Sequence, residues 1–162
     1  MRVIPLILGL FLPACGQPGA AGLPAAAPID FASLHRPSSP NTALAAPSGF
    51  QPAPDLVTRT YGLPAPELYA LANRVAAAQK RTFPQAAFAG QLQAQYVVRS
   101  ALLNFPDLVT IQVDPAGPAA STLILWSRSV YGYSDLGVNR NRLVAWLAAL
   151  DAALPANSKG TP

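Results

Sequence analysis

The chain has 162 residues, enough for one domain and some irregular sequence but not for two domains. Its formal net charge of +4 comes mostly from scattered basic residues, so we do not expect nucleic acid as a partner. A single cysteine excludes an intramolecular disulfide and a cysteine metal cluster.

The chain begins with Arg2 and an apolar run over residues 3–12, which has the length of a signal-peptide core and is too short to span a bilayer. The run ends in Leu12-Pro13-Ala14-Cys15, which resembles the lipobox of bacterial lipoproteins. The resemblance implies that residues 1–14 are removed and that Cys15 carries palmitate or related acyl chains as a membrane anchor. Because Gly16 is not the aspartate that retains lipoproteins at the inner membrane, it implies the outer membrane. The alternative is an incidental cysteine in an ordinary signal peptide.

The next two segments are rich in proline. Residues 15–28 contain Pro, Gly and Ala without charges, which predicts an extended tether. Residues 29–54 add apolar side chains among the prolines, which predicts an irregular segment laid over the surface of the domain. The apolar anchors of this segment are Phe31, Leu34, Leu44 and Phe50.

The remaining elements predict a single α+β domain over residues 29–155, followed by a flexible tail at 156–162. A short strand at 58–63 precedes a helix that starts at Pro64 and ends near Lys80. Turn residues separate three strands that we expect to be antiparallel neighbours. The strands cover about 91–103, 108–113 and 122–130, and a last helix covers 138–154. We therefore expect a small antiparallel sheet of about three to five strands with both helices on one face.

Period-two alternation gives each strand two faces. In the first of the three strands, Gln91, Gln93 and Gln95 alternate with apolar residues, which predicts one wet face. In the last strand Arg128 shares a face with apolar side chains, so its guanidinium needs an acceptor. The sequence leaves two alternatives open: a pair with an aspartate that locks sheet to helix, or an anion-binding arginine. The aspartates considered are Asp135, Asp107 and Asp114.

The last strand leads through Ser134-Asp135-Leu136-Gly137 into the last helix. Ser134 or Asp135 is expected to cap that helix, whose free N–H groups also offer an anion site. Asn139 falls on the apolar stripe and points inward, whereas Arg140 and Arg142 flank the stripe. The candidate ligand-binding or structural site comprises Arg128, Ser129, Asp135, Asn139 and Arg140.

The inventory for catalysis is thin. His35 is the only histidine, nothing places it beside a nucleophile, and no residues show metal-ligand spacing. We therefore expect no cofactor and no metal. An enzyme alternative remains, a hydrolase or transferase in which Asp107 or Asp135 acts as base and Arg128 or Arg140 holds an anionic transition state.

Three stretches resemble the domain of unknown function 1499 family, in its lipoprotein-like branch. They are "RPSSPNTALAAP" (36–47), "YVVRSALLNFPDLVTIQV" (96–113) and "STLILWSRSVYGYSDLGVNRNRLVAWLAAL" (121–150). The chain departs from the pattern at Leu108, where many members carry a second aspartate. The resemblance implies a shared motif but no reaction.

These observations favour a non-enzymatic module on the periplasmic side of the bacterial envelope, lipid-anchored through Cys15. Its expected partners are the membrane and either a small anionic ligand or another envelope protein. A purely structural role for the polar motif is the competing interpretation.

Overall fold

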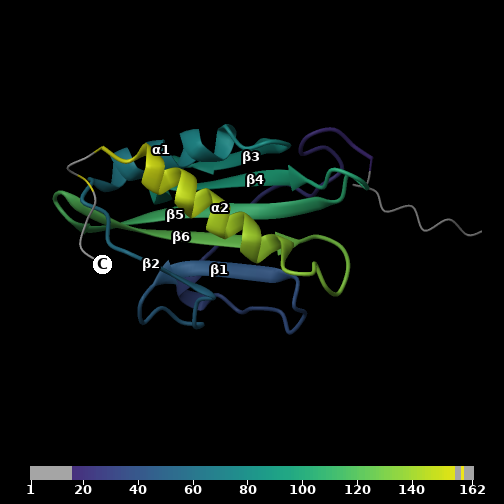
Figure 1. Ribbon diagram of the computed structural model, residues 1–162, viewed down its shortest axis with the longest axis horizontal. Helices are drawn as coiled ribbons and strands as arrows, with labels where there is room; N and C mark the ends of the chain where they lie inside the picture. The colour runs from purple at the N-terminus through teal and green to yellow at the C-terminus, as the bar shows by residue number, and fades with distance from the viewer. Residues whose placement is uncertain (1–15, 156–157, 159–162) are drawn as a thin grey trace, which may run out of the picture.

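A computed structural model describes residues 16–155 and 158. These residues form one six-stranded sheet in the order β2-β1-β6-β5-β4-β3, with α1 and α2 together on one face (Figure 1). The strands are β1 (Thr42–Pro47), β2 (Leu56–Thr58), β3 (Thr82–Phe88), β4 (Gln93–Arg99), β5 (Pro106–Gly117) and β6 (Ala120–Ser129). The helices are α1 (Ala65–Ala77) and α2 (Val138–Ala153), with short 3₁₀ turns η1 (Phe31–Ser33) and η2 (Ala89–Gln91).

The α+β class and the two helices on one face are confirmed, but the expected three to five antiparallel strands are wrong. The described residues contain six strands, and β1 pairs with β2 in parallel, so the sheet is mixed. β1 escaped prediction because its alanine-rich sequence is buried on both faces and shows no alternation. β3 escaped because it is an edge strand interrupted by Pro84 and by a register shift. The strand expected at 58–63 ends at Thr58, and beyond it Tyr61 makes an isolated bridge to Ser121.

The helix-covered face holds the larger core. The stripe predicted for the last helix is confirmed, since Leu143, Trp146 and Leu150 of α2 are buried in this core. Trp146 packs edge-on against Tyr96 of β4, with the ring centroids 6.3 Å apart and the planes at 84°. Such a contact adds to the apolar burial that holds helix and sheet together.

The opposite face is covered by the N-terminal chain, so the wet face predicted for β4 is wrong. Gln93 and Gln95 are buried there, and their amides bond the backbone of residues 27–29. Gln93 both accepts from the amide of Ile29 at 2.7 Å and donates to its carbonyl at 2.9 Å. A side chain thereby supplies the bonds that a neighbouring strand would supply. Farther along β4, Arg99 donates to the carbonyls of Gly19 and Ala21.

We call residues 17–29 the N-terminal strap. This segment falls mostly within the predicted tether, but it does not hang free: residues 19–22 form turns, residues 24–29 run along the sheet, and Gln93, Gln95 and Arg99 bond the segment to the sheet. Residue 15 and the predicted leader 1–14 lie outside the described residues. So does the predicted tail apart from Ser158, whose carbonyl accepts from the amide of Gly62. No helix in the described part of the chain is long and apolar enough to cross a membrane.

Candidate functional site

The alternation of β6 divides the predicted site between the two faces of the sheet. Ile124 and Trp126 belong to a small core under the strap with Phe31 of η1, whereas Leu123 and Leu125 belong to the helix-side core. By the same alternation Arg128 lies on the strap side, and Ser127 and Ser129 face α2. Both faces were assigned correctly from the sequence.

On the helix side, Asn139 is fully buried, as predicted from its place on the apolar stripe. Its amide nitrogen lies 3.0 Å from the hydroxyl of Ser129, 3.0 Å from the carbonyl of Asn41 and 2.6 Å from a carboxylate oxygen of Asp135. One side chain therefore connects β6, the residue before β1 and the start of α2. Ser129, Asp135 and Asn139 therefore belong to one hydrogen-bonded network.

Asp135 caps α2. One carboxylate oxygen accepts from the amide of Gly137 at 3.0 Å and the other from the amide of Asn139 at 2.7 Å. Gly137 has φ +82°, a conformation that favours glycine. Because Asp135 fills the acceptor positions at this helix start, the free anion site expected there is already occupied by a side chain. The Arg128–Asp135 pair considered in the sequence analysis does not form, since the two groups lie on opposite faces.

The ion pair that joins sheet and helix is instead Arg142 with Asp107. A guanidinium nitrogen of Arg142 lies 2.6 Å from a carboxylate oxygen of Asp107, and each side chain is only 10% exposed. The other terminal nitrogen donates to Ser127 at 2.9 Å and to the side-chain oxygen of Asn139 at 2.6 Å. Sequence reasoning missed this pair. The i, i+3 spacing of Asn139 and Arg142 indicates that these two side chains are neighbours on the helix. The sequence does not show that Asp107 lies near Arg142, because its position depends on the pairing of β5 with β6.

Arg140 is separated from the rest of the predicted site. It is exposed in the first turn of α2, and within the described residues it makes no hydrogen bond or ion pair. Replacing Arg140 therefore controls for the loss of one positive charge outside the cavity that Arg128 lines.

Arg128 faces a cavity of about 310 Å³ between the strap and the sheet. The strap contributes one wall, and Gln95, Leu108, Thr110 and Val130 contribute the floor beside Arg128. The strap residues lining this cavity are Leu23, Pro24, Ala25, Ala26, Ala27 and Ile29. Among the described residues, Arg128 has no hydrogen-bond or ion-pair partner.

Burial lowers the pKa of the Arg128 guanidinium, because removal from water disfavours the charged form. An arginine remains protonated in proteins despite such a shift. The cavity therefore contains a partly desolvated positive charge that no described side chain neutralises. A carboxylate or phosphate is the group that such a guanidinium binds best.

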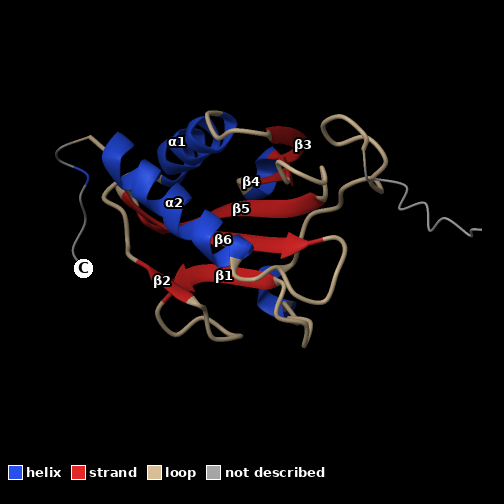
Figure 2. Cartoon of the chain, turned by 45° about the vertical axis from the view of Figure 1, so that its right-hand side comes forward, coloured by secondary structure: helices blue, strands red, loops and turns tan. Residues whose placement is uncertain are grey.

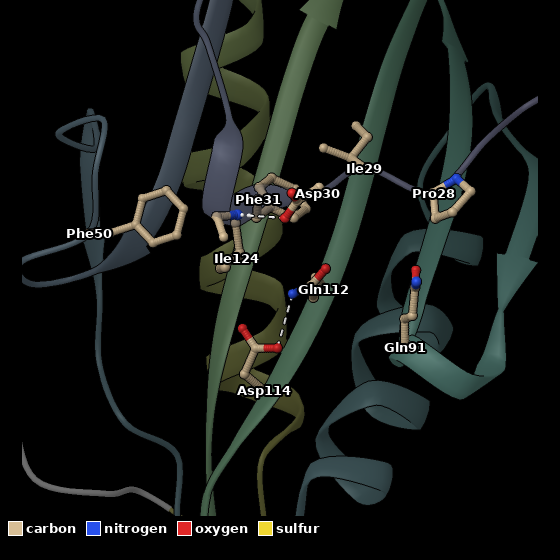
Figure 3. Close-up of a pocket in the computed structure, with 10 residues that line it drawn as sticks. Pro28, Ile29, Asp30, Phe31, Phe50, Gln91, Gln112, Asp114 and Ile124 are labelled. Carbon is tan, nitrogen blue, oxygen red and sulfur yellow. Dashed lines mark hydrogen bonds between the residues drawn. The ribbon is translucent and has the colours of Figure 1, made fainter.

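A second cavity, of about 590 Å³, lies on the other side of Ile29 (Figure 3). It carries the carboxylates of Asp30 and Asp114, which accept from the amide of Ala32 and from the side chain of Gln112. Two negative charges disfavour an anion there. The two cavities beneath the N-terminal segment are thus of opposite charge.

Other catalytic arrangements find no support in the described residues. His35 is exposed, and its ring nitrogen bonds the carbonyl of Ser33. No cluster of three or more His, Cys, Asp or Glu side chains suited to a metal ion occurs in the part that the structure describes. Asp107 and Asp135, the candidate bases, are both engaged on the face opposite Arg128.

A scan against protein families matches residues 34–150 to DUF1499, described as a protein of unknown function. A comparison with curated proteins finds no significant match. The family match runs from just after η1 almost to the end of α2, so it includes Arg128 and the Asn139 network but not the strap. Because the match covers most of the chain, this protein belongs to the DUF1499 family of proteins of unknown function.

Proposed function

We propose that the protein is a non-enzymatic binding module of the bacterial cell envelope that takes a small anionic ligand onto Arg128. In this proposal a lipidated Cys15 anchors the module at the periplasmic side of the outer membrane. The observation that carries the ligand proposal is the uncompensated guanidinium of Arg128 in the cavity beneath the strap. An isolated charge taken out of water destabilises a fold unless a partner offsets the loss of hydration.

The cavity limits the class of ligand. Its volume of about 310 Å³ is near the lower end of the range of roughly 300–1,000 Å³ for small-molecule sites. Leu23, Leu108 and Val130 supply apolar walls, while the amide nitrogen of Gln95 is already bonded to the strap. One cation beside apolar walls, with Gln85 and Thr110 also lining the cavity, favours a carboxylate or phosphate monoanion with a short body.

In this proposal the other predicted site residues on the helix side stabilise the fold and do not bind the ligand. Ser129, Asp135 and Asn139 connect β6 to α2, and Arg142 with Asp107 strengthens the same junction. The enzyme alternative needs a base beside the anion-binding arginine. No described observation favours it, because both aspartates lie across the sheet from Arg128.

Nuclear magnetic resonance tests the ligand proposal directly. Short alkyl carboxylates and alkyl phosphates are titrated into the protein, with alkyl alcohols of the same length as uncharged controls. We expect the anions alone to shift the Arg128 side-chain signal and the amides of Leu108, Thr110 and Val130. Arg128→Gln should abolish these shifts, and the matched variant Arg140→Gln should retain them. Shifts that survive in Arg128→Gln, or that the alcohols reproduce, would refute the proposal.

Metabolic labelling tests the anchor separately. Cells that produce the protein are grown with radioactive palmitate, and the wild type is compared with Cys15→Ala. We expect label on the wild type alone, because the acyl chains attach to this cysteine. A labelled Cys15→Ala protein would overturn the anchor.

A further inference from the structure

Two loops at one end of the sheet expose large apolar side chains. In the loop between β4 and β5, Leu102 is 90% exposed and Leu103 58% exposed. In the loop between β6 and α2, Leu136 is 92% exposed and Tyr133 74% exposed. We call these four residues the apolar tip. Single exposed leucines are ordinary on protein surfaces, but several in neighbouring loops mark a contact surface.

The topology places the two loops side by side. β5 begins where β6 ends, with Asp107 paired to Ser129, and the amide of Val130 donates to the carbonyl of Pro106 at 3.2 Å. Figures 1 and 2 both show the two loops at the same end of the sheet, opposite the end at which α2 finishes. The four residues of the apolar tip therefore lie in two loops that leave neighbouring strand ends at the same end of the sheet.

Leu136 shows that this surface is costly to maintain. Its φ of +53° is a left-handed conformation that disfavours a branched side chain by about 1–2 kcal/mol. Asp135 and Gly137 hold the turn through the cap of α2, which leaves the Leu136 side chain in solvent. A partner outside the molecule would explain why Leu136 combines a strained backbone with an exposed apolar side chain.

The described chain also starts at this end. Asn104, in the same loop as Leu102, donates to the carbonyl of Gln17 at 2.9 Å. Figure 1 shows the strap turning at this end of the sheet. In the sequence Gly16 directly follows Cys15 and is separated by three residues from the apolar run 3–12, so a lipid on Cys15 or an uncleaved leader would each hold this end of the domain near a membrane.

Two basic side chains, Arg81 and Arg140, lie at this end of the sheet, and the two aspartates there are both engaged in the fold. Arg81 donates to the side-chain oxygen of Asn104 at 2.6 Å, and Arg140 is exposed at the start of α2. Of the aspartates at this end, Asp107 is paired with Arg142 and Asp135 caps α2. An apolar surface with a tyrosine and a basic rim matches the interface of a bilayer that contains anionic lipids.

We infer that the apolar tip docks on the membrane surface, with Leu102 and Leu136 entering the interface and Arg81 and Arg140 facing anionic headgroups. This contact fixes the orientation of the domain and directs the long axis of the sheet away from the bilayer. It is independent of a ligand on Arg128, and it does not require that Cys15 be acylated.

Fluorescence in vesicles tests the inference on the full chain. Cys15→Ser removes the native thiol, and an environment-sensitive fluorophore is attached at Leu136→Cys or, as a matched control, at Val57→Cys on β2. Val57 is also an exposed apolar residue, 67% exposed, but it lies on the edge strand away from the tip. Both proteins keep residues 1–14, so any tether that these residues provide is the same. The vesicles contain phosphatidylcholine, phosphatidylglycerol and a lipid spin-labelled near its headgroup.

We expect the label at position 136 to shift its emission to the blue and to be quenched by the spin-labelled lipid, and the label at position 57 to do neither. Emission that remains water-like at both positions would overturn the inference. A blue shift at position 136 without lipid quenching would also overturn it, because a second copy or another protein would then cover the tip. Arg128→Gln must leave both signals unchanged, which separates this result from the ligand proposal.

A variant without the leucines supplies the second test. With the label moved to Leu103→Cys, the double substitution Leu102→Ser and Leu136→Ser should reduce lipid quenching by about tenfold or more, since each buried leucine changes a partition equilibrium by roughly that factor. The melting temperature should not fall, because both side chains are exposed in the fold. Undiminished quenching in a folded double variant would contradict the inference.

Discussion

Arg128 and Arg142 lie near the same end of the sheet on opposite faces, and their replacement by methionine should have opposite effects on stability. Arg142 pairs with Asp107 at 2.6 Å in a buried site, whereas Arg128 has no partner among the described residues. Methionine retains an unbranched apolar side chain in both cases, so the comparison isolates the guanidinium.

Arg142→Met leaves the buried carboxylate of Asp107 without its cation and removes the bonds to Ser127 and Asn139. Breaking a buried ion pair in this way costs about 3–5 kcal/mol. A domain of this size loses about 4 °C of melting temperature per kcal/mol, so the expected drop is roughly 12–20 °C.

Arg128→Met removes a partly buried charge that no described side chain offsets and keeps an unbranched apolar side chain in the cavity that Leu108 and Val130 also line. We expect the protein without ligand to become more stable by about 0.5–1 kcal/mol, or about 2–4 °C. Differential scanning calorimetry of the wild type and both variants at neutral pH measures both effects. A large loss of stability in Arg128→Met would instead show that Arg128 has a structural partner, and it would rule out an uncompensated charge at this position.

Three further predictions concern the cap, the strap and a buried tyrosine. Asp135→Ala should lower the free energy of unfolding in urea by about 1–2 kcal/mol, because it removes the cap of α2. Ser134→Ala loses one hydrogen bond at an exposed site and should change the free energy of unfolding by about 0.5 kcal/mol at most. An equal loss of free energy of unfolding in the two variants would show that the Asp135 side chain does not stabilise the start of α2. Arg99→Leu should release residues 17–22 from the sheet, because it removes the bonds to Gly19 and Ala21. Amide hydrogen exchange should become faster there and change little at Ile29, which Gln93 holds. Unchanged exchange would show that Arg99 does not hold the strap. Burial raises the pKa of Tyr61 from 10.0 to about 12, so the stability contributed by its neutral form is complete below pH 10 and is lost as pH rises toward 12. Between pH 10 and pH 12 the free energy of unfolding of Tyr61→Phe, measured in urea, should therefore fall by about 2 kcal/mol less than that of the wild type. An equal fall in both proteins would show that a group other than Tyr61 titrates.

Elements with a clear period were predictable from the sequence. Leu68, Leu71 and Ala72 form a stripe that located α1, and Leu143, Trp146 and Leu150 located α2. The two longest strands, β5 and β6, were also found, although their shared hairpin extends farther than the turn residues suggested. β1 was missed because a strand of alanines buried on both faces has no period to detect.

The faces of the site were predictable, but its contacts were not. Alternation placed Arg128 opposite Ser127, and the helical wheel turned Asn139 inward, because both depend on local geometry. The pairing of Arg142 with Asp107 depends on how α2 packs against β5, and no local pattern in the sequence predicts that packing. The polar face of β4 was taken as solvated for a similar reason. Gln93 and Gln95 find their partners in backbone groups more than sixty residues earlier, in a segment without a hydrophobic period.

Native mass spectrometry of protein purified from its own envelope shows whether Arg128 holds an anionic ligand in the cell. The wild type and Arg128→Gln are purified in parallel, with Arg140→Gln as the matched control for loss of one exposed charge. We expect a bound small acidic molecule on the wild type and on Arg140→Gln, and none on Arg128→Gln. Identical spectra for the wild type and Arg128→Gln would contradict it.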